Sequence, residues 1–238
     1  LLLPPFQPNR RHPLGKTITL QAADGHRFPA YVAEPAGKPR GAIVVLQEIF
    51  GVNSHIRSVA DGYAADGYFV VAPSTFSRAQ GGPGLGLELG YTEADMGQGF
   101  GLKTAVDGLP APGVMADIQA AIDHAASAGK VGIVGYCWGG LLTWRAACSL
   151  QGLSAAAPYY GGGMTGEADA ARQATVPVLA HFGDQDHWIP LDTVEVFKKV
   201  QPGVSVHVYA ANHGFNCDQR GSYNEAAAKL ARERTLAF

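Results

Sequence analysis

The stretch Lys130-Val-Gly-Ile-Val-Gly-Tyr-Cys-Trp-Gly-Gly140 decides the fold. Its first half is a short apolar run typical of a buried β-strand, and Trp138–Leu150 after it reads as a helix. Between them, Gly135-Tyr136-Cys137-Trp138-Gly139 matches the nucleophile elbow G-x-S-x-G with cysteine in place of serine. The motif predicts that Cys137 stands at a helix N-terminus, where the partial positive charge favours a thiolate and an oxyanion. The alternative is a glycine-rich turn around a buried structural cysteine.

Apolar runs and helical patterns alternate from about residue 40 onward. Strands separated by helices of this length imply right-handed crossovers and a mostly parallel sheet. Before them, Ala23-Asp24-Gly25 predicts the turn of a hairpin. We therefore expect an α/β fold with a mostly parallel central sheet and helices on both faces. The expected strands are Lys16–Leu20, Arg27–Ala33, Gly41–Gln47, Tyr68–Ala72, Lys130–Val134, Ser154–Tyr160, Val176–Phe182 and Val204–Ala210, and the expected helices are Asn53–Asp66, Val114–Ala128, Trp138–Leu150, Leu191–Val200 and Ser222–Leu236.

The 238 residues are expected to form a single domain, because the sequence shows no internal repeat and no second core. Residues 1–14 are predicted to be an extended N-terminal arm. Residues 74–112 are rich in glycine and lack clear periodicity, apart from a short helix expected near Glu93–Gly97. So long an irregular stretch in a compact domain is usually functional, which predicts a cap or loop region there.

Composition excludes several classes of protein. Apolar residues make up 47 % of the chain and charged residues 16 %, which argues against disorder. A net charge of −2 favours neither a nucleic-acid surface nor a polybasic membrane patch. Three cysteines, an odd and low number, indicate a reducing compartment, so we expect a cytoplasmic protein. The expected partner is a small molecule, with the protein a monomer or small homo-oligomer.

A general base and an acid follow Cys137 in the order that a nucleophile–acid–histidine triad requires. His213 comes directly after the strand Val204–Ala210. The segment Gly183-Asp184-Gln185-Asp186 offers two carboxylates, and Asp186 is preferred because it lies on the turn, clear of the strand. His181, Asp184 and His187 are conceivable metal ligands, but one short loop cannot easily aim all three at one ion. We expect neither a metal nor a cofactor.

The sequence resembles the dienelactone hydrolase (carboxymethylenebutenolidase) family of α/β-hydrolases. Four segments carry the resemblance, which extends over most of residues 15–238 and is weakest across 74–112. They are Gln47-Glu-Ile-Phe-Gly-Val-Asn53, Gly135-Tyr-Cys-Trp-Gly-Gly140, Gln185-Asp-His-Trp-Ile-Pro190 and Ala211-Asn-His-Gly-Phe215.

The resemblance implies a Cys137–His213–Asp186 triad. It also implies that Glu48 holds and then deprotonates the thiol, and that the backbone N–H groups of Trp138 and Ile49 form the oxyanion hole. The position of Glu48 in the sequence independently indicates a functional role. A carboxylate at the end of a buried strand is costly in free energy unless it is paired with another group or takes part in catalysis.

Substrate binding is less well defined by the sequence. Family members that act on dienelactone hold its carboxylate with arginines, one of which follows the histidine by a few residues, and Gly214-Phe-Asn-Cys217 offers none there. Arg220, Arg78 and Lys103 are the candidates to replace them, and Phe50 and Phe215 are expected to form apolar walls.

We therefore expect a hydrolase that cleaves a lactone or carboxylic ester through a thioester intermediate. A general carboxylesterase or thioesterase without dienelactone activity is one alternative. A non-catalytic binding protein on the same fold is the other.

Overall fold

A computed structural model gives the arrangement of residues 15–80 and 86–238. The predicted N-terminal arm, 1–14, lies outside these described residues, as do residues 81–85 of the predicted cap or loop region.

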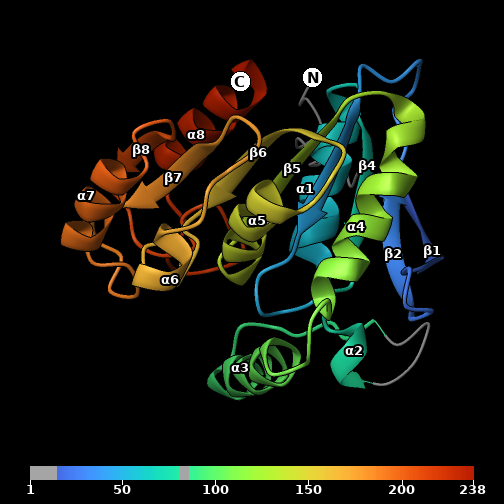
Figure 1. The fold of residues 1–238 in the computed structure, drawn as a ribbon, viewed down its shortest axis with the longest axis horizontal. Coiled ribbons are helices and arrows are strands. Elements are labelled where there is room, and N and C mark those ends of the chain that lie inside the picture. Colours follow the sequence, from blue (N-terminus) through green and yellow to red (C-terminus); the bar gives the residue numbers. More distant parts are fainter. Residues whose placement is uncertain (1–14, 81–85) are drawn as a thin grey trace, which may run out of the picture.

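The described residues form an eight-stranded sheet in the order β1-β2-β4-β3-β5-β6-β7-β8 (Figure 1). The hairpin β1–β2 adds to β4 antiparallel, and the pairs from β4 to β8 are parallel. The prediction of a mostly parallel α/β sheet is thus confirmed. The strands are β1 (Gly15–Gln21), β2 (Arg27–Ala33), β3 (Ala42–Leu46), β4 (Phe69–Pro73), β5 (Val131–Tyr136), β6 (Leu153–Tyr159), β7 (Leu179–Gly183) and β8 (Ser205–Tyr209).

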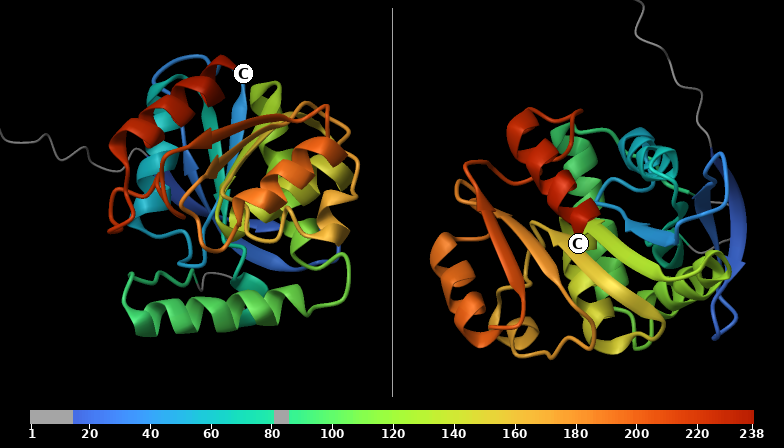
Figure 2. Two further views of the ribbon diagram at one scale, coloured as in Figure 1. Left: turned by 90° about the vertical axis from the view of Figure 1, so that its left-hand side faces the viewer. Right: turned by 90° about the horizontal axis from the view of Figure 1, so that it is seen from above.

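Helices cover both faces of this sheet (Figures 1 and 2). On one face α1 and α8 meet, where Arg232 lies over the ring of Tyr63. On the other face α5 and α7 meet through an edge-on contact of Trp144 with Phe197. No helix within 15–80 and 86–238 is long and apolar enough to cross a bilayer. The helices are α1 (Ser54–Ala65), α2 (Ser77–Gln80), α3 (Glu93–Asp107), α4 (Val114–Ala125), α5 (Trp138–Ser149), α6 (Glu167–Ala170), α7 (Leu191–Val200) and α8 (Glu225–Ala237), with a 3₁₀ turn at Ala126–Ala128.

The predicted cap or loop region contains a helix much longer than expected. α3 starts at Glu93, as predicted, but runs for 15 residues to Asp107. A capping box between Thr92 and Asp95 fixes its start. The glycines in this segment interrupt the apolar periodicity by which a helix is predicted from sequence. One of them is required by close packing, because a Cβ on Gly99 would lie 2.2 Å from the carbonyl oxygen of Ile49. In Figure 1, α3 lies apart from the sheet at one end of the molecule, and α3 residues line the pocket described below.

Candidate active site

Cys137 stands on a tight turn between β5 and α5. Its backbone is in the left-handed region, with φ 57° and ψ −119°, where non-glycine residues are uncommon. Such strain persists only where the surroundings enforce it, and it is typical of functional turns. The turn presents the half-buried thiol beside the first residue of α5, at the positive end of the helix dipole.

Two glycines make this turn sterically feasible. A Cβ on Gly135 would lie 2.1 Å from the carbonyl oxygen of Gly139, across the turn. A Cβ on Gly139 would lie 2.3 Å from the carbonyl oxygen of Gln47, at the end of β3. Both distances are far below van der Waals contact. The elbow therefore packs against both its own helix and the neighbouring strand.

His213 joins Cys137 to Asp186. Its Nε2 lies 3.1 Å from Cys137 Sγ, and its Nδ1 lies 2.7 Å from Asp186 Oδ2. Asp186 is held in turn by the backbone N–H groups of Trp188 and Ile189, which donate to its Oδ1 at 2.8 and 3.2 Å. The structure thus brings together the three predicted residues in the order nucleophile, base and acid. Asp184, the other candidate acid, is exposed on the same loop.

The surroundings of His213 favour its charged form. Burial alone would lower the pKa of His213, but the negative charge at Cys137 and the Asp186 carboxylate raise it to about 10. An imidazolium that lies between a sulfur and a carboxylate can donate to both.

Replacing Asp186 by asparagine should lower the pKa of His213. Asparagine keeps the Oδ1 acceptor for the two backbone N–H groups but removes the charge that faces Nδ1. Titration of the imidazole nitrogens by NMR should show the shift, with His181 as an internal control. Burial lowers the pKa of His181 to about 3, and that value should not move.

Asp186→Asn should also have a lower free energy of unfolding than the wild type, by an amount that depends on pH. The folded pKa of His213, about 10, lies above its ordinary value of 6.5. Its charged interactions therefore stabilise the fold fully below pH 6.5, and the contribution disappears as the pH rises through 10. In urea denaturation, Asp186→Asn should cost about 1.5–3 kcal/mol at pH 6 and progressively less towards pH 10. A constant difference across this range would contradict the assignment.

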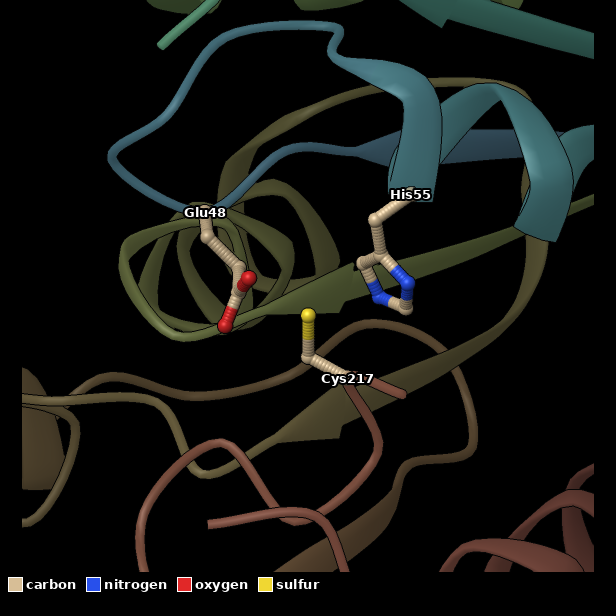
Figure 3. A group of neighbouring side chains, drawn as sticks. All are labelled: Glu48, His55 and Cys217. Carbon is tan, nitrogen blue, oxygen red and sulfur yellow. The ribbon is translucent and has the colours of Figure 1, made fainter. Parts of the chain in front are cut away.

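Glu48 follows β3 and lies within the protein, 1 % exposed. Its Oε1 accepts a hydrogen bond of 2.9 Å from Nη1 of Arg220, a residue of the loop after His213. This pairing offsets the cost of burying the carboxylate. Figure 3 shows that the Glu48 side chain also points toward Cys217 and His55.

A cavity of about 330 Å³ opens above the thiol. Ile49, Phe50 and Trp138 border it near Cys137, Lys103 and Phe100 reach it from α3, and Trp188 and Arg220 complete it. Trp188 is 61 % exposed and its ring lies 5.7 Å from that of Phe100. The mouth of the pocket is therefore aromatic, while its cations, Lys103 and Arg220, lie among apolar groups.

Two residues predicted to bind substrate lie elsewhere, and these predictions are corrected. Arg78 is not part of this pocket, because its guanidinium is held by Asp24 and Asp117. Phe215 is fully buried, and its ring packs against Tyr160 and Tyr209 beneath the site. Phe215 thus supports the site from the core and does not form its wall.

Tyr160 is a site residue that the sequence reasoning missed. It follows β6 with a positive φ of 36°, and its ring packs 5.1 Å from the ring of His213. Its hydroxyl is buried without a hydrogen-bond partner, and burial holds the pKa of this phenol well above its usual value. Its position at a strand's carboxyl end, before three glycines, is the signal that points to it.

His181 is not placed for the metal site that the sequence had raised. It is fully buried in β7, where its ring nitrogens lie 2.8 Å from the Tyr209 hydroxyl and 3.0 Å from that of Thr235. Asp184 and His187 are both exposed. The alternative of a shared ion at His181, Asp184 and His187 is set aside.

A parallel sheet with helices on both faces and a cysteine elbow aligned with a histidine and an aspartate define an α/β-hydrolase. The model of the dienelactone hydrolase family matches residues 28–238. The chain belongs to that family and is a hydrolase of ester or lactone bonds.

Known relatives match nearly the whole chain. The carboxymethylenebutenolidase of Pseudomonas putida is 36 % identical over 233 residues, which cover 94 % of this chain and 96 % of that protein. The crystal structure of a "putative dienelactone hydrolase" from Klebsiella pneumoniae subsp. pneumoniae is 31 % identical, with a TM-score of 0.78 and coverage of 94 % and 96 %. The Pyrococcus furiosus esterase Pf2001 shares the fold at 13 % identity, with a TM-score of 0.63 and coverage of 93 % and 92 %.

Proposed function

We propose that Cys137 cleaves an ester or lactone by attacking its carbonyl carbon, with His213 as acid and base and Asp186 as the group that orients it. One observation carries the proposal: His213 contacts the Cys137 sulfur at 3.1 Å and the Asp186 carboxylate at 2.7 Å through its two ring nitrogens, and Cys137 lines a cavity. This is the geometry that nucleophilic acyl transfer requires.

The reaction has two halves. His213 takes the thiol proton as the Cys137 sulfur adds to the carbonyl carbon, and the backbone N–H groups of Trp138 and Ile49 bind the oxyanion. When the C–O bond breaks, His213 gives its proton to the departing oxygen and a thioester remains on Cys137. His213 then takes a proton from water, which attacks the thioester and releases the acid, and the thiol forms again.

Glu48 is proposed as the second base for the thiol. In the present arrangement it is held by Arg220, and His213 is the group in contact with Cys137. A substrate carboxylate that binds Arg220 would compete with Glu48 for the guanidinium. The freed carboxylate would then be available to take a proton from the thiol, so that activation would follow substrate binding.

The proposed substrate is a small lactone that carries a carboxylate, the class to which the relatives' name carboxymethylenebutenolidase refers. Two cations support this choice. Lys103, on α3, and Arg220, on the loop after His213, both line the cavity. We propose that these two residues hold the substrate carboxylate, as arginines do in the family members that act on dienelactone.

Lys103→Met tests this choice. The variant should raise KM for carboxymethylenebutenolide by about 10-fold or more, since a hydrogen bond to a charged group is worth about 1.5–3 kcal/mol. Its rate on p-nitrophenyl acetate, which has no carboxylate, should stay close to that of the wild type. Lys198→Met is the matched control, because Lys198 pairs with Glu195 on α7, outside the pocket. An unchanged KM for the lactone would remove Lys103 from substrate recognition.

A neutral ester is the second candidate substrate, and two observations favour it. Both pocket cations already have acidic partners: Lys103 Nζ lies 2.7 Å from Asp107, and Arg220 binds Glu48. The pocket mouth is formed by the aromatic rings of Trp188 and Phe100, which suit an aryl or alkyl group. Wild-type activity on p-nitrophenyl esters with none on the lactone would select this candidate.

We also propose a cytoplasmic location and a monomer or small homo-oligomer. The three free cysteines of the described residues fit a reducing compartment.

A further inference from the structure

A second cluster of reactive side chains lies behind the catalytic pocket. Glu48 follows β3, His55 belongs to α1, and Cys217 lies on the loop after His213. Within residues 15–80 and 86–238 they form a group whose carboxylate oxygen, ring nitrogen and sulfur all lie within 4.8 Å of one another. In Figure 3 the Glu48 carboxylate and the His55 ring lie on either side of the Cys217 sulfur. The three residues are between 0 and 2 % exposed.

The ring of His55 is held on one side and faces the cluster on the other. His55 Nδ1 lies 3.2 Å from Asp218 Oδ1, which fixes the ring, while Nε2 is buried without a conventional hydrogen-bond partner and the imidazole interacts with the Cys217 thiol. A buried ring nitrogen left with so weak a partner as a thiol calls for an explanation. Imidazole ligands of metal ions commonly show this arrangement, with one nitrogen on a carboxylate and the other on the ion. The contact between Asp218 and His55 has the form of the outer half of such a unit.

We propose that Glu48, His55 and Cys217 bind a thiophilic divalent cation of the zinc class. Carboxylate oxygen, imidazole nitrogen and thiolate sulfur are the three donor types that zinc accepts, whereas a thiolate disfavours magnesium and calcium. In a tetrahedral site with ordinary bond lengths, ligand atoms lie about 3.5 Å apart. The three side chains therefore close by at most about 1.3 Å around the ion.

Neighbouring charges fit a divalent ion. The Glu48 carboxylate, the Cys217 thiolate and Asp218 supply three negative charges, which balance the ion together with Arg220. Arg220 donates to Glu48 Oε1, and a carboxylate can bind an ion through its other oxygen. The Cys217 thiol donates a hydrogen bond of 3.3 Å to the Tyr91 hydroxyl, and once the thiol proton is lost to an ion the hydroxyl could donate to the sulfur instead.

A second cavity, of about 380 Å³, borders the cluster at His55. His55 and Asp218 both line this cavity, and none of its lining residues lines the catalytic pocket. The acidic Asp218 and Glu225 share its wall with the basic Lys229 and Arg232. An ion that reached His55 from this side would not pass through the catalytic pocket.

Metal binding would also regulate the enzyme. An ion on Glu48 removes a carboxylate that is proposed to accept the thiol proton, so the bound form should be less active. This consequence rests on the role proposed for Glu48, whereas binding itself does not.

Cobalt(II) is the probe that tests the site, because thiolate ligation gives it an absorption band in the near ultraviolet. The wild-type protein should bind one ion per chain with this band, and zinc should displace it. Cys217→Ser should remove the band, and His55→Gln should weaken cobalt binding by about 10-fold or more. Circular dichroism checks that both variants remain folded. Zinc should slow wild-type hydrolysis of p-nitrophenyl acetate and leave Cys217→Ser at its uninhibited rate.

Two controls separate this site from the catalytic thiol. Cys137→Ser and Cys148→Ser should both keep the cobalt band. A band that is lost in Cys137→Ser, or that persists in Cys217→Ser, would place the ion elsewhere and overturn the proposal. So would the absence of wild-type binding at millimolar cobalt. Cobalt binding without inhibition by zinc would leave the site in place and refute only the role of Glu48.

Discussion

Cys137→Ala should abolish ester hydrolysis, with a loss of kcat on the order of 10⁴–10⁶-fold, because it removes the sulfur that is proposed to form the covalent intermediate. The thiol touches His213 and borders the cavity, so its removal eliminates the nucleophile. The elbow itself should stay intact, since alanine fills less space than cysteine. Steady-state rates on p-nitrophenyl acetate and on the lactone measure the loss. Thermal unfolding close to that of the wild type would show that the fold is kept.

Cys148→Ala is the matched control for this experiment. Cys148 is half-buried on the same helix, α5, and burial raises the pKa of its thiol to about 11. It should therefore react slowly with iodoacetamide at neutral pH, whereas Cys137 should react quickly and lose activity in parallel. Substantial hydrolysis by Cys137→Ala, with Cys148→Ala unchanged, would exclude Cys137 as the nucleophile.

Gly139→Ala should destabilise the fold by about 3 kcal/mol or more, the upper end of what overpacking usually costs. The added Cβ would lie 2.3 Å from the carbonyl oxygen of Gln47 and 2.6 Å from that of Leu46. Both are backbone atoms at the end of β3, which cannot turn aside as a flexible side chain can. Relief would need α5 to move away from β3, the strand that Glu48 follows. Urea denaturation should show a much lower midpoint than that of the wild type.

Gly101→Ala provides the contrast. Gly101 is exposed in α3, and a Cβ there meets nothing within 4 Å. Alanine is the better helix former, so this variant should gain about 0.5–1 kcal/mol. If Gly139→Ala and Gly101→Ala unfolded at the same urea concentration, steric crowding at the elbow would be excluded as the reason for glycine at position 139.

The central sheet could be predicted from sequence because buried strands and amphipathic helices have distinct periods. The expected strand Gly41–Gln47 and helix Asn53–Asp66 lie close to β3 and α1. The length of α3 was not predictable from local helix propensity. Gly99 is required there because the backbone of Ile49, which is distant in sequence, lies too close for a Cβ. A contact between distant parts of the chain leaves no local sequence pattern.

The triad was predictable for a similar reason: each member follows a strand, and parallel strands end at the same edge. The ion-pair partners of the charged residues were not predictable from the sequence. Arg78 seemed free to bind substrate, but the fold pairs it with Asp117, which is 39 residues away. His55 and Asp218 are 163 residues apart, and no pattern in the sequence connects them.

The contact between α3 and the elbow has a mechanical consequence. Asp107, at the end of α3, accepts a hydrogen bond of 3.1 Å from the indole of Trp138 and pairs with Lys103. The helix α3, which lines the cavity, is thus hydrogen-bonded to the residue whose backbone N–H is proposed to receive the oxyanion. Moving this end of α3 away from the elbow would break that bond and loosen the indole. Entry that moves only the contacting rings of Phe100 and Trp188 would leave the bond in place.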